Sequence, residues 1–326
     1  MSSLDSLQVA ESISLQLDTL TPFYTGGVGQ HGDQIHPSGI LGGIRRFSCL
    51  LAAAVGDRQF EYDVWGTPAD ARDGRHAKRV AIRVNPSGLK LVDLPERIDW
   101  PRADERRRNG WFYNVAYEGR LELVFTRRGI SNARWQLLLL ALRILIRHAT
   151  LGSRDQFGLG VFKAEDLPEV APLRSSVASP LDLPGLHRAF FATVLFESAL
   201  PVNWQGRLEQ GLRWREHLRG SLRGDGQERL RHYVFGELNR QGNAVNVSAV
   251  YPVTGGCALR VWGVLPHTVP PQFLNQRATV MNALKRALEQ GPSHPLPGTR
   301  TLSWDDGAGY GADLVDWINR LAGVTP

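Results

Sequence analysis

The stretch Thr21 to Arg46, TPFYTGGVGQHGDQIHPSGILGGIRR, decides how this sequence is interpreted. The residues before it, from Ile13 to Leu17, alternate between apolar and polar and predict a β-strand. Pro37 and Ser38 mark the start of a helix, because proline fits the first helical turn and serine can cap free backbone N–H groups. The stretch therefore predicts a strand, a glycine-rich loop and a helix.

The predicted helix has two distinct faces. One is an apolar stripe at helical spacing that predicts burial, formed by Ile40, Ile44, Phe47 and Leu51. The other carries three glycines and an arginine, namely Gly39, Gly42, Gly43 and Arg46. A glycine inside a helix costs about 1 kcal/mol relative to alanine, so three in five residues need a compensating reason. Two reasons stay open: a neighbouring strand packs tightly there, or an anion such as an RNA phosphate approaches the backbone.

The composition is that of a globular chain with a basic balance. The length of 326 residues is enough for two domains. The hydrophobic share of 42% and the charged share of 21% predict a substantial core. The net charge is +6 and the pI about 9.6, and the positive excess is carried by arginine. Arginine has a planar fork that suits phosphate and stacks on bases. The arginine excess could therefore reflect nucleic-acid binding, and the alternative explanations are a solvated basic face and a codon bias.

Cysteine usage and the chain start indicate a cytoplasmic protein. Cys49 and Cys257 are far apart and show neither metal-ligand spacing nor a disulfide framework. The segment MSSLDSLQVAES has no basic flank and no apolar core, so no signal peptide is expected. The longest strongly apolar run, Leu137 to Leu142, is far shorter than the ~20 residues that span a bilayer. We expect no metal, no cofactor and no membrane contact.

The first half has the order strand, helix, strands, helix and strand, which is the βαββαβ order of a ferredoxin-like or RNA-recognition-like domain. After the first helix we expect short strands at Tyr62–Trp65 and Val80–Val92, a strand or hairpin at Trp111–Arg128, an apolar helix from Ser131–Asn132, and a strand at Val161–Phe162. The segment from Leu94 to Gly110 is charged and contains three consecutive arginines from Arg106. It is either a solvated surface loop or a loop that reaches a partner.

The second half repeats this order after a proline-rich linker. Its expected elements are a strand at His187–Phe196, a helix at Leu208–Arg223, a turn and strand at Tyr233–Tyr251, a strand at Ala258–Leu265, a helix at Gln272–Glu289, and a glycine-rich loop at Trp304-Asp305-Asp306 before a final helix capped near Asp313. We expect an α+β protein with two tandem ferredoxin-like domains and antiparallel sheets. The predicted boundaries are 1–166, the linker 167–184, and 185–326.

These motifs, in this order, resemble RAMP-superfamily proteins of type III CRISPR effector complexes, and most of all subunit one of the Cmr complex. The first stretch matches at Thr21, Pro22, Gly26, Gly27, Pro37, Ser38, Leu41, Gly42, Ile44 and Arg45. A glycine-rich segment from Leu151 to Gly160 matches at Arg154, Gly158 and Gly160. A looser third match comprises Phe235, Gly236, Arg240 and Asn246.

The resemblance implies two fused RAMP domains in an RNA-binding structural subunit of a ribonucleoprotein for antiviral defence. Its partners would be CRISPR guide RNA, target RNA and paralogous RAMP subunits, with RNA contacted near the end of the subunit filament. The expected RNA-binding residues are Gly26, Gly27, His36, Ser38, Gly42, Arg45, Arg46, Arg154, Gln156, Gly158 and Arg240. Glycines let the backbone approach the sugar-phosphate chain, and arginines neutralise phosphates; ordinary surface ion pairs are the alternative for the arginines. Phe23, Tyr24 and Phe157 would either stack on bases or pack in the core.

Two enzymatic alternatives remain beside the non-catalytic interpretation. A related RAMP subunit with ribonuclease activity would use Asp33 with a divalent metal, or His31 and His36 as general acid and base. These residues are equally typical of a surface turn. A small-molecule enzyme with a phosphate-binding loop is the more distant alternative, because GGVGQHGD fits neither GxGxxG nor GxxxxGK[ST].

Overall fold

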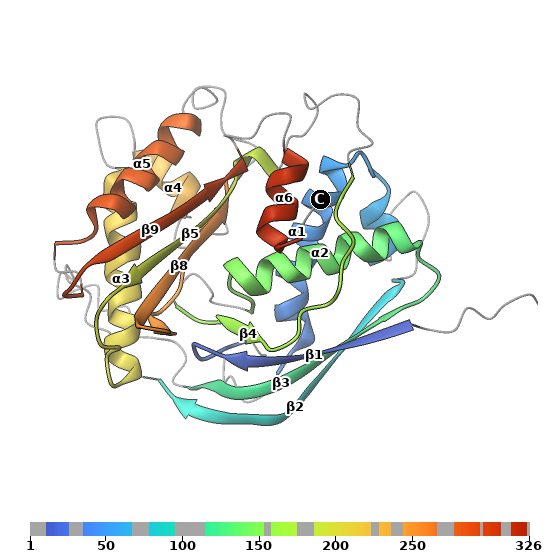
Figure 1. The fold of residues 1–326 in the computed structure, drawn as a ribbon, viewed down its shortest axis with the longest axis horizontal. Helices are drawn as coiled ribbons and strands as arrows, with labels where there is room; N and C mark the ends of the chain where they lie inside the picture. The colour runs from blue at the N-terminus through green and yellow to red at the C-terminus, as the bar shows by residue number, and fades with distance from the viewer. Residues whose placement is uncertain are drawn as a thin grey trace, which may run out of the picture.

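The chain forms two antiparallel sheets with helices packed against them (Figure 1). The computed structural model describes residues 11–25, 35–66, 78–94, 115–152, 158–174, 186–222, 228–235, 244–265, 277–293, 296–307 and 314–324.

The first sheet has the strand order β2-β3-β1-β4, and each neighbouring pair is antiparallel. Its half of the chain comprises β1 (Glu11–Thr19), α1 (Pro37–Ala54), the π-helical turn η2 (Glu61–Trp65), β2 (Val80–Asp93), β3 (Val115–Arg127), α2 (Asn132–His148) and β4 (Phe162–Ala164). This is the ferredoxin-like order. The β1 register pairs Leu15 with Leu123, which turns the apolar side chains toward α1 and α2.

The second sheet repeats the topology with the order β6-β8-β5-β9, and β7 adds to β8. Its elements are η6 (Leu186–Arg188), β5 (Ala189–Phe196), α3 (Trp204–Ser221), α4 (Glu228–Phe235), β6 (Val245–Val247), β7 (Tyr251–Val253), β8 (Gly256–Val264), α5 (Arg277–Gln290), β9 (Arg300–Asp306) and α6 (Leu314–Ala322). The predicted α+β class with tandem ferredoxin-like domains and antiparallel sheets is confirmed.

Three local predictions were wrong. Tyr62–Trp65 is a π-helical turn that ends where the Gly66 N–H bonds the Tyr62 carbonyl, so it is no strand. Trp304–Asp306 is the end of β9 rather than a loop, because it pairs with β5 and Trp304 stacks on Phe190 with ring centroids 5.0 Å apart. Tyr233 to Phe235 ends helix α4 instead of forming a turn. In each case the short segment is compatible with more than one secondary structure, and contacts with residues distant in sequence decide which one forms.

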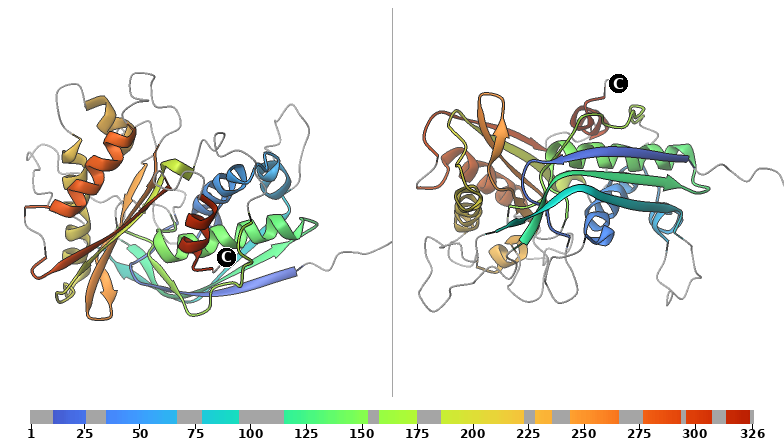
Figure 2. Two further views of the ribbon diagram at one scale, coloured as in Figure 1. Left: turned by 45° about the horizontal axis from the view of Figure 1, so that its top comes forward. Right: turned by 90° about the horizontal axis from the view of Figure 1, so that it is seen from below.

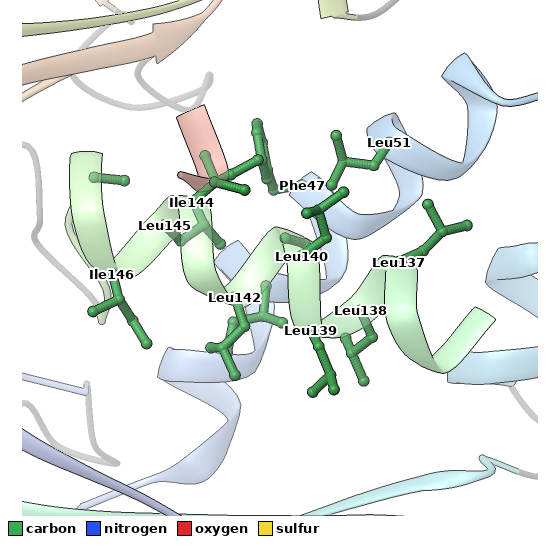
Figure 3. Packing of buried hydrophobic residues seen from close by; sticks show 14 of the residues in the cluster. Phe47, Leu51, Leu137, Leu138, Leu139, Leu140, Leu142, Ile144, Leu145 and Ile146 are labelled. Atoms are coloured by element: carbon green, nitrogen blue, oxygen red, sulfur yellow. The ribbon is translucent and has the colours of Figure 1, made fainter. Parts of the chain in front are cut away.

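The helices α1 and α2 lie between the two sheets (Figure 2). Figure 3 shows the leucine-rich α2 packed against Phe47 and Leu51 of α1. On the far side of this layer, Phe191 of β5 packs edge-on against Phe47 at 5.8 Å and stacks on Trp262 at 6.3 Å. One face of the second sheet therefore shares a core with the helices of the first half.

A buried arginine joins the second sheet to the end of α2. Arg260 of β8 donates from Nη1 to the carbonyls of Ile146 and Ala149, at 2.9 and 3.0 Å. Its Nε donates to the hydroxyl of Tyr251 at 3.1 Å. Carbonyls at a helix C-terminus lack intrahelical partners and carry partial negative charge, so a cation there satisfies both needs.

The last helix, α6, returns to the first half and packs on α2. Asn319 bonds both backbone groups of Leu173, at 2.8 and 3.0 Å. Arg143 of α2 donates to the carbonyls of Ala322 and Pro168, at 2.5 and 3.0 Å. Residues 314–322 thus contribute to the core of the first half, and the boundaries 1–166, 167–184 and 185–326 stay a prediction.

The α2–α6 contact should make the stability depend on pH through His148. Its Nε2 lies 2.8 Å from the Leu321 carbonyl, and burial, with smaller contributions from Arg260 and Arg147, lowers its pKa to about 4. Because the unfolded chain takes up this proton near pH 6.5, the folded state loses stability as the pH falls from 6.5 toward 4.

We expect His148 to account for a loss of about 2 kcal/mol between pH 7 and pH 5. The variant His148→Gln keeps an N–H donor but does not titrate, so it should lose that much less stability over the same interval. Denaturant unfolding of both proteins at the two pH values measures the difference. Equal losses would show that His148 does not titrate in this way.

Candidate nucleic-acid interface

Both glycine-rich loops begin and end at one place beside β1. Thr21 Oγ1 accepts the Val161 N–H at 3.0 Å, and the Gly160 N–H donates to the Pro22 carbonyl at 2.9 Å. Thr21 is fully buried, so this hydrogen bond is shielded from water. The described ends of the two loops therefore lie next to each other.

The first loop is closed by a side chain at its start. Thr25 Oγ1 accepts the N–H of His36 at 2.7 Å, which joins the last described residue before the loop to the residue that precedes α1. A Cβ on Gly39 would come within 2.9 Å of the Thr25 carbonyl carbon and Cα. Close packing by the chain's own backbone therefore explains this glycine.

Gly42 differs from the other two glycines of α1 in its surroundings. A Cβ on Gly43 would meet only a Leu151 methyl at 3.8 Å, whereas a Cβ on Gly42 would have no atom within 4 Å. Gly42 is exposed, as are Ser38 one turn before it and Arg46 one turn after it. The described fold does not require glycine at position 42, and alanine at this position would stabilise the helix.

Two arginines flank Gly42 around the helix. At about 100° per residue, Arg45 and Arg46 lie on either side of it, about 60° and 40° away. Arg45 donates from Nη2 and Nε to one oxygen of Glu61, at 2.7 and 3.1 Å, in a pair exposed on both sides. Such a surface pair contributes about 0–1 kcal/mol and is screened by salt, so a phosphate can compete for the guanidinium. Arg46 Nη2 donates to the Val264 carbonyl at 3.4 Å.

Lys78 was missed by the sequence interpretation. It lies before β2 with its Nζ 5.9 Å from the ring centroid of Trp65, and Trp65 Nε1 donates to Ser48 Oγ of α1 at 3.2 Å. Burial and the nearby charge of Arg45 lower the pKa of Lys78. In the sequence, Lys78 lies at the basic end of the polar segment DARDGRHAKR, and this basic end is the signal that could have indicated it.

The remaining predicted site residues are partly outside the described part of the chain. Those outside are Gly26, Gly27, His31, Asp33, Arg154, Gln156, Phe157 and Arg240. Gly158 is described, and its contacts are with the second half. Its carbonyl accepts the Ala249 N–H at 2.9 Å, and a Cβ there would lie 2.8 Å from a Leu208 methyl.

Two of the proposed stacking aromatics belong to the core. Phe23 is fully buried and packs edge-on against Phe162 at 5.3 Å, and Tyr24 is 2% exposed. Neither ring presents a face to a base, so the stacking hypothesis is wrong for both. They end up inside because residues 20–25 continue β1 across β3, where Phe23 pairs with Tyr117.

The open face of the first sheet carries a polar network instead of aromatic rings. None of the described helices covers this face (Figure 2). Arg120 bonds Asp18 at 2.7 and 2.8 Å and Glu165 at 2.9 Å, and the Arg120 contact holds the pKa of Asp18 below its usual range. Glu122 accepts from Ser14 at 2.5 Å. On the described strands this face offers paired charges rather than a stacking platform of the RNA-recognition type.

Groups of three His, Cys, Asp or Glu side chains that could hold a metal ion do not occur in the described part of the chain. Among the described helices, none is long and apolar enough to cross a membrane.

No family model matches the sequence, and no curated protein matches it. Three solved structures are similar in fold. Cmr1 from Pyrococcus furiosus in its apo form is 14% identical with a TM-score of 0.46, over 90% of this chain and 98% of that one. A chain of the type III-B Cmr-beta complex bound to cognate target RNA is 10% identical with a TM-score of 0.46, over 86% and 99%.

A chain of Cmr-beta bound to cognate target RNA and AMPPnP in the presence of single-stranded DNA is 9% identical with a TM-score of 0.45, over 84% and 99%. The likeness of this chain to all three structures is one of fold.

Gly39 and Gly42 of α1 should respond oppositely to alanine. We expect Gly42→Ala to raise the free energy of unfolding by about 0.5–1 kcal/mol, because alanine favours the helix and meets nothing. Gly39→Ala should lower it by about 1–3 kcal/mol, because the methyl group would overlap the Thr25 backbone. Denaturant unfolding measures both changes, and changes of the same sign would contradict this assignment.

Proposed function

We propose that this chain is an RNA-binding structural subunit of a type III, Cmr-type CRISPR effector complex. It contacts guide or target RNA near the end of the subunit filament and works in the cytoplasm in antiviral defence. Its partners are these RNAs and paralogous RAMP subunits. The sequence motifs support the resemblance to this family, and the geometry around α1 supports RNA contact there.

The observation that carries the proposal is the exposed glycine at position 42 between two arginines. No described residue lies against this helical glycine, and a glycine there weakens the free protein, so we seek its reason in a bound partner. A glycine allows a sugar-phosphate backbone to approach the helix surface closely. Arg45 and Arg46 then lie where guanidinium groups can neutralise phosphates on either side.

The loop ends place further groups beside this surface. Thr25 and His36 hold the first loop at the start of α1, and Thr21 ties it to the end of the second glycine-rich loop. Backbone N–H groups of the first helical turn favour anions. His36, Ser38 and Gly42 lie at this surface. RNA contact at these three residues stays a prediction, as it does at Gly26, Gly27, Arg154, Gln156, Gly158 and Arg240.

A glutamine scan of two matched glycines tests the proposal. Gly42 and Gly220 both lie in helices with no atom within 4 Å of an added Cβ. We expect Gly42→Gln to weaken binding of labelled single-stranded guide RNA about tenfold or more, because the side chain displaces a charge-assisted contact. Gly220→Gln should bind like the wild type.

The same titrations, run with and without Mg²⁺ at several salt concentrations, also test the mode of binding. Phosphate contacts give a log–log salt slope of about −0.7 per neutralised phosphate on single strands. Intact RNA throughout is the result expected of a structural subunit, whereas cleavage that depends on Asp33 or His36 would favour the ribonuclease alternative. Absence of RNA binding by the wild type, or equal loss in both glycine variants, would refute the proposal.

A further inference from the structure

We infer that Lys78, together with Arg45 and Arg46, forms a cationic row across the exposed face of α1 that holds successive phosphates of single-stranded RNA. The inference rests on the proposed function and deepens it, because it assigns a residue and a direction to the bound strand. The strand runs across the helix rather than along it.

The position of Lys78 beside α1 follows from a chain of contacts. Its ammonium group lies over the ring of Trp65, whose Nε1 donates to Ser48 Oγ. Ser48 Oγ in turn donates to the Arg45 carbonyl at 3.0 Å. Lys78 therefore lies next to the segment of α1 that carries Arg45, although 33 residues separate the two in sequence.

The three cations lie in order around the helix. Arg46 is on the side of the second half, where it reaches the Val264 carbonyl of β8. Gly42 and then Arg45 follow across the exposed face, and Lys78 lies beyond them over Trp65. An α-helix with its side chains is about 10–12 Å wide, so a strand that crosses it meets these groups one after another.

The row has an excess of positive charge. Glu61 is the acid that pairs with Arg45, and this pair is open to solvent on both sides. The thiol of Cys49 lies nearby and stays neutral, because burial raises its pKa to about 12. Among the described residues, Lys78, Arg45 and Arg46 bring positive charge to this face, and Glu61 pairs with Arg45. Such a cluster favours an anionic partner, and a phosphate backbone offers its charges in series.

A purely structural role for Lys78 is the competing explanation. An exposed ammonium group over a tryptophan ring contributes about 0.5–1 kcal/mol to stability. That role predicts no response of Lys78 to RNA. The two explanations therefore differ in whether RNA covers the Lys78 amine.

Lysine footprinting measures directly whether RNA covers the Lys78 amine. The full sequence has only four lysines to distinguish, namely Lys78, Lys90, Lys163 and Lys285. Acylating reagents attack the neutral amine, and the lowered pKa of Lys78 gives it a larger neutral fraction at pH 8. A bound phosphate both covers the amine and favours its charged form. The full-length protein is acylated with and without a single-stranded RNA of guide length, and each lysine is quantified by mass spectrometry.

We expect acylation of Lys78 to fall about tenfold at an RNA concentration about ten times the dissociation constant, since roughly nine-tenths of the protein is then bound. Lys285 is exposed on α5 and should react equally with and without RNA. The matched variants Lys78→Gln and Lys285→Gln complete the test. The salt slope of RNA binding should become shallower by about 0.7 in the first and stay unchanged in the second.

The outcomes separate this inference from the proposed function. RNA binding by the wild type without protection of Lys78, and with an unchanged salt slope in Lys78→Gln, overturns the inference but leaves the function standing. No RNA binding by the wild type overturns both. Protection of Lys285 as strong as that of Lys78 shows unspecific coating of the protein and also overturns the inference.

Discussion

The contact between Arg260 and the last carbonyls of α2 is the interaction on which the arrangement of the two sheets depends. A guanidinium that leaves water must have its charge and its donors satisfied, and here two helix-end carbonyls and the Tyr251 hydroxyl do so. Trp262, two residues along β8, adds a hydrogen bond from Nε1 to Thr150 Oγ1 at 2.7 Å. With β8 fixed in this way, Phe191 packs against α1, and α1 holds the ends of the first loop.

This use of arginine changes how the basic composition should be interpreted. Several arginines donate to backbone carbonyls of the chain itself, namely Arg143, Arg147, Arg188, Arg207, Arg260 and Arg300. Arg300, for example, bonds the Glu289 and Gln290 carbonyls at the end of α5. The net charge of +6 therefore says little about nucleic acid, because much of the excess is used in the fold. We propose RNA contact because of the local arrangement around Gly42 instead.

The strand and helix order could be predicted from the sequence because it follows from local periodicity. The α1 stripe of Ile40, Ile44 and Phe47 is buried as its spacing indicates, and Ser131 caps α2 by accepting the Arg134 N–H. Features set by distant partners could not be predicted. The sequence around Trp304 predicts a loop, and only the contact with Phe190 in the folded protein shows that it belongs to a strand.

The candidate site was predicted only in part for the same reason. Gly39 and Gly42 are equivalent in a sequence, yet Thr25 packs on one and nothing packs on the other. Phe23 and Tyr24 are adjacent to the glycines and suggest stacking, but β3 draws both into the core. Lys78 is joined to α1 only through the ring of Trp65, and no spacing in the sequence shows that contact.

The central claim is that RNA lies against α1 and the loop ends, and that the open face of the first sheet stays free of it. Photo-crosslinking of the full-length protein to single-stranded RNA substituted with 4-thiouracil tests this most directly, with crosslinked peptides identified by mass spectrometry. The account predicts crosslinks in the peptides that contain Ser38 to Arg46. Crosslinks concentrated on the outward residues of β1 and β3, such as Gln16 and Arg120, would contradict it.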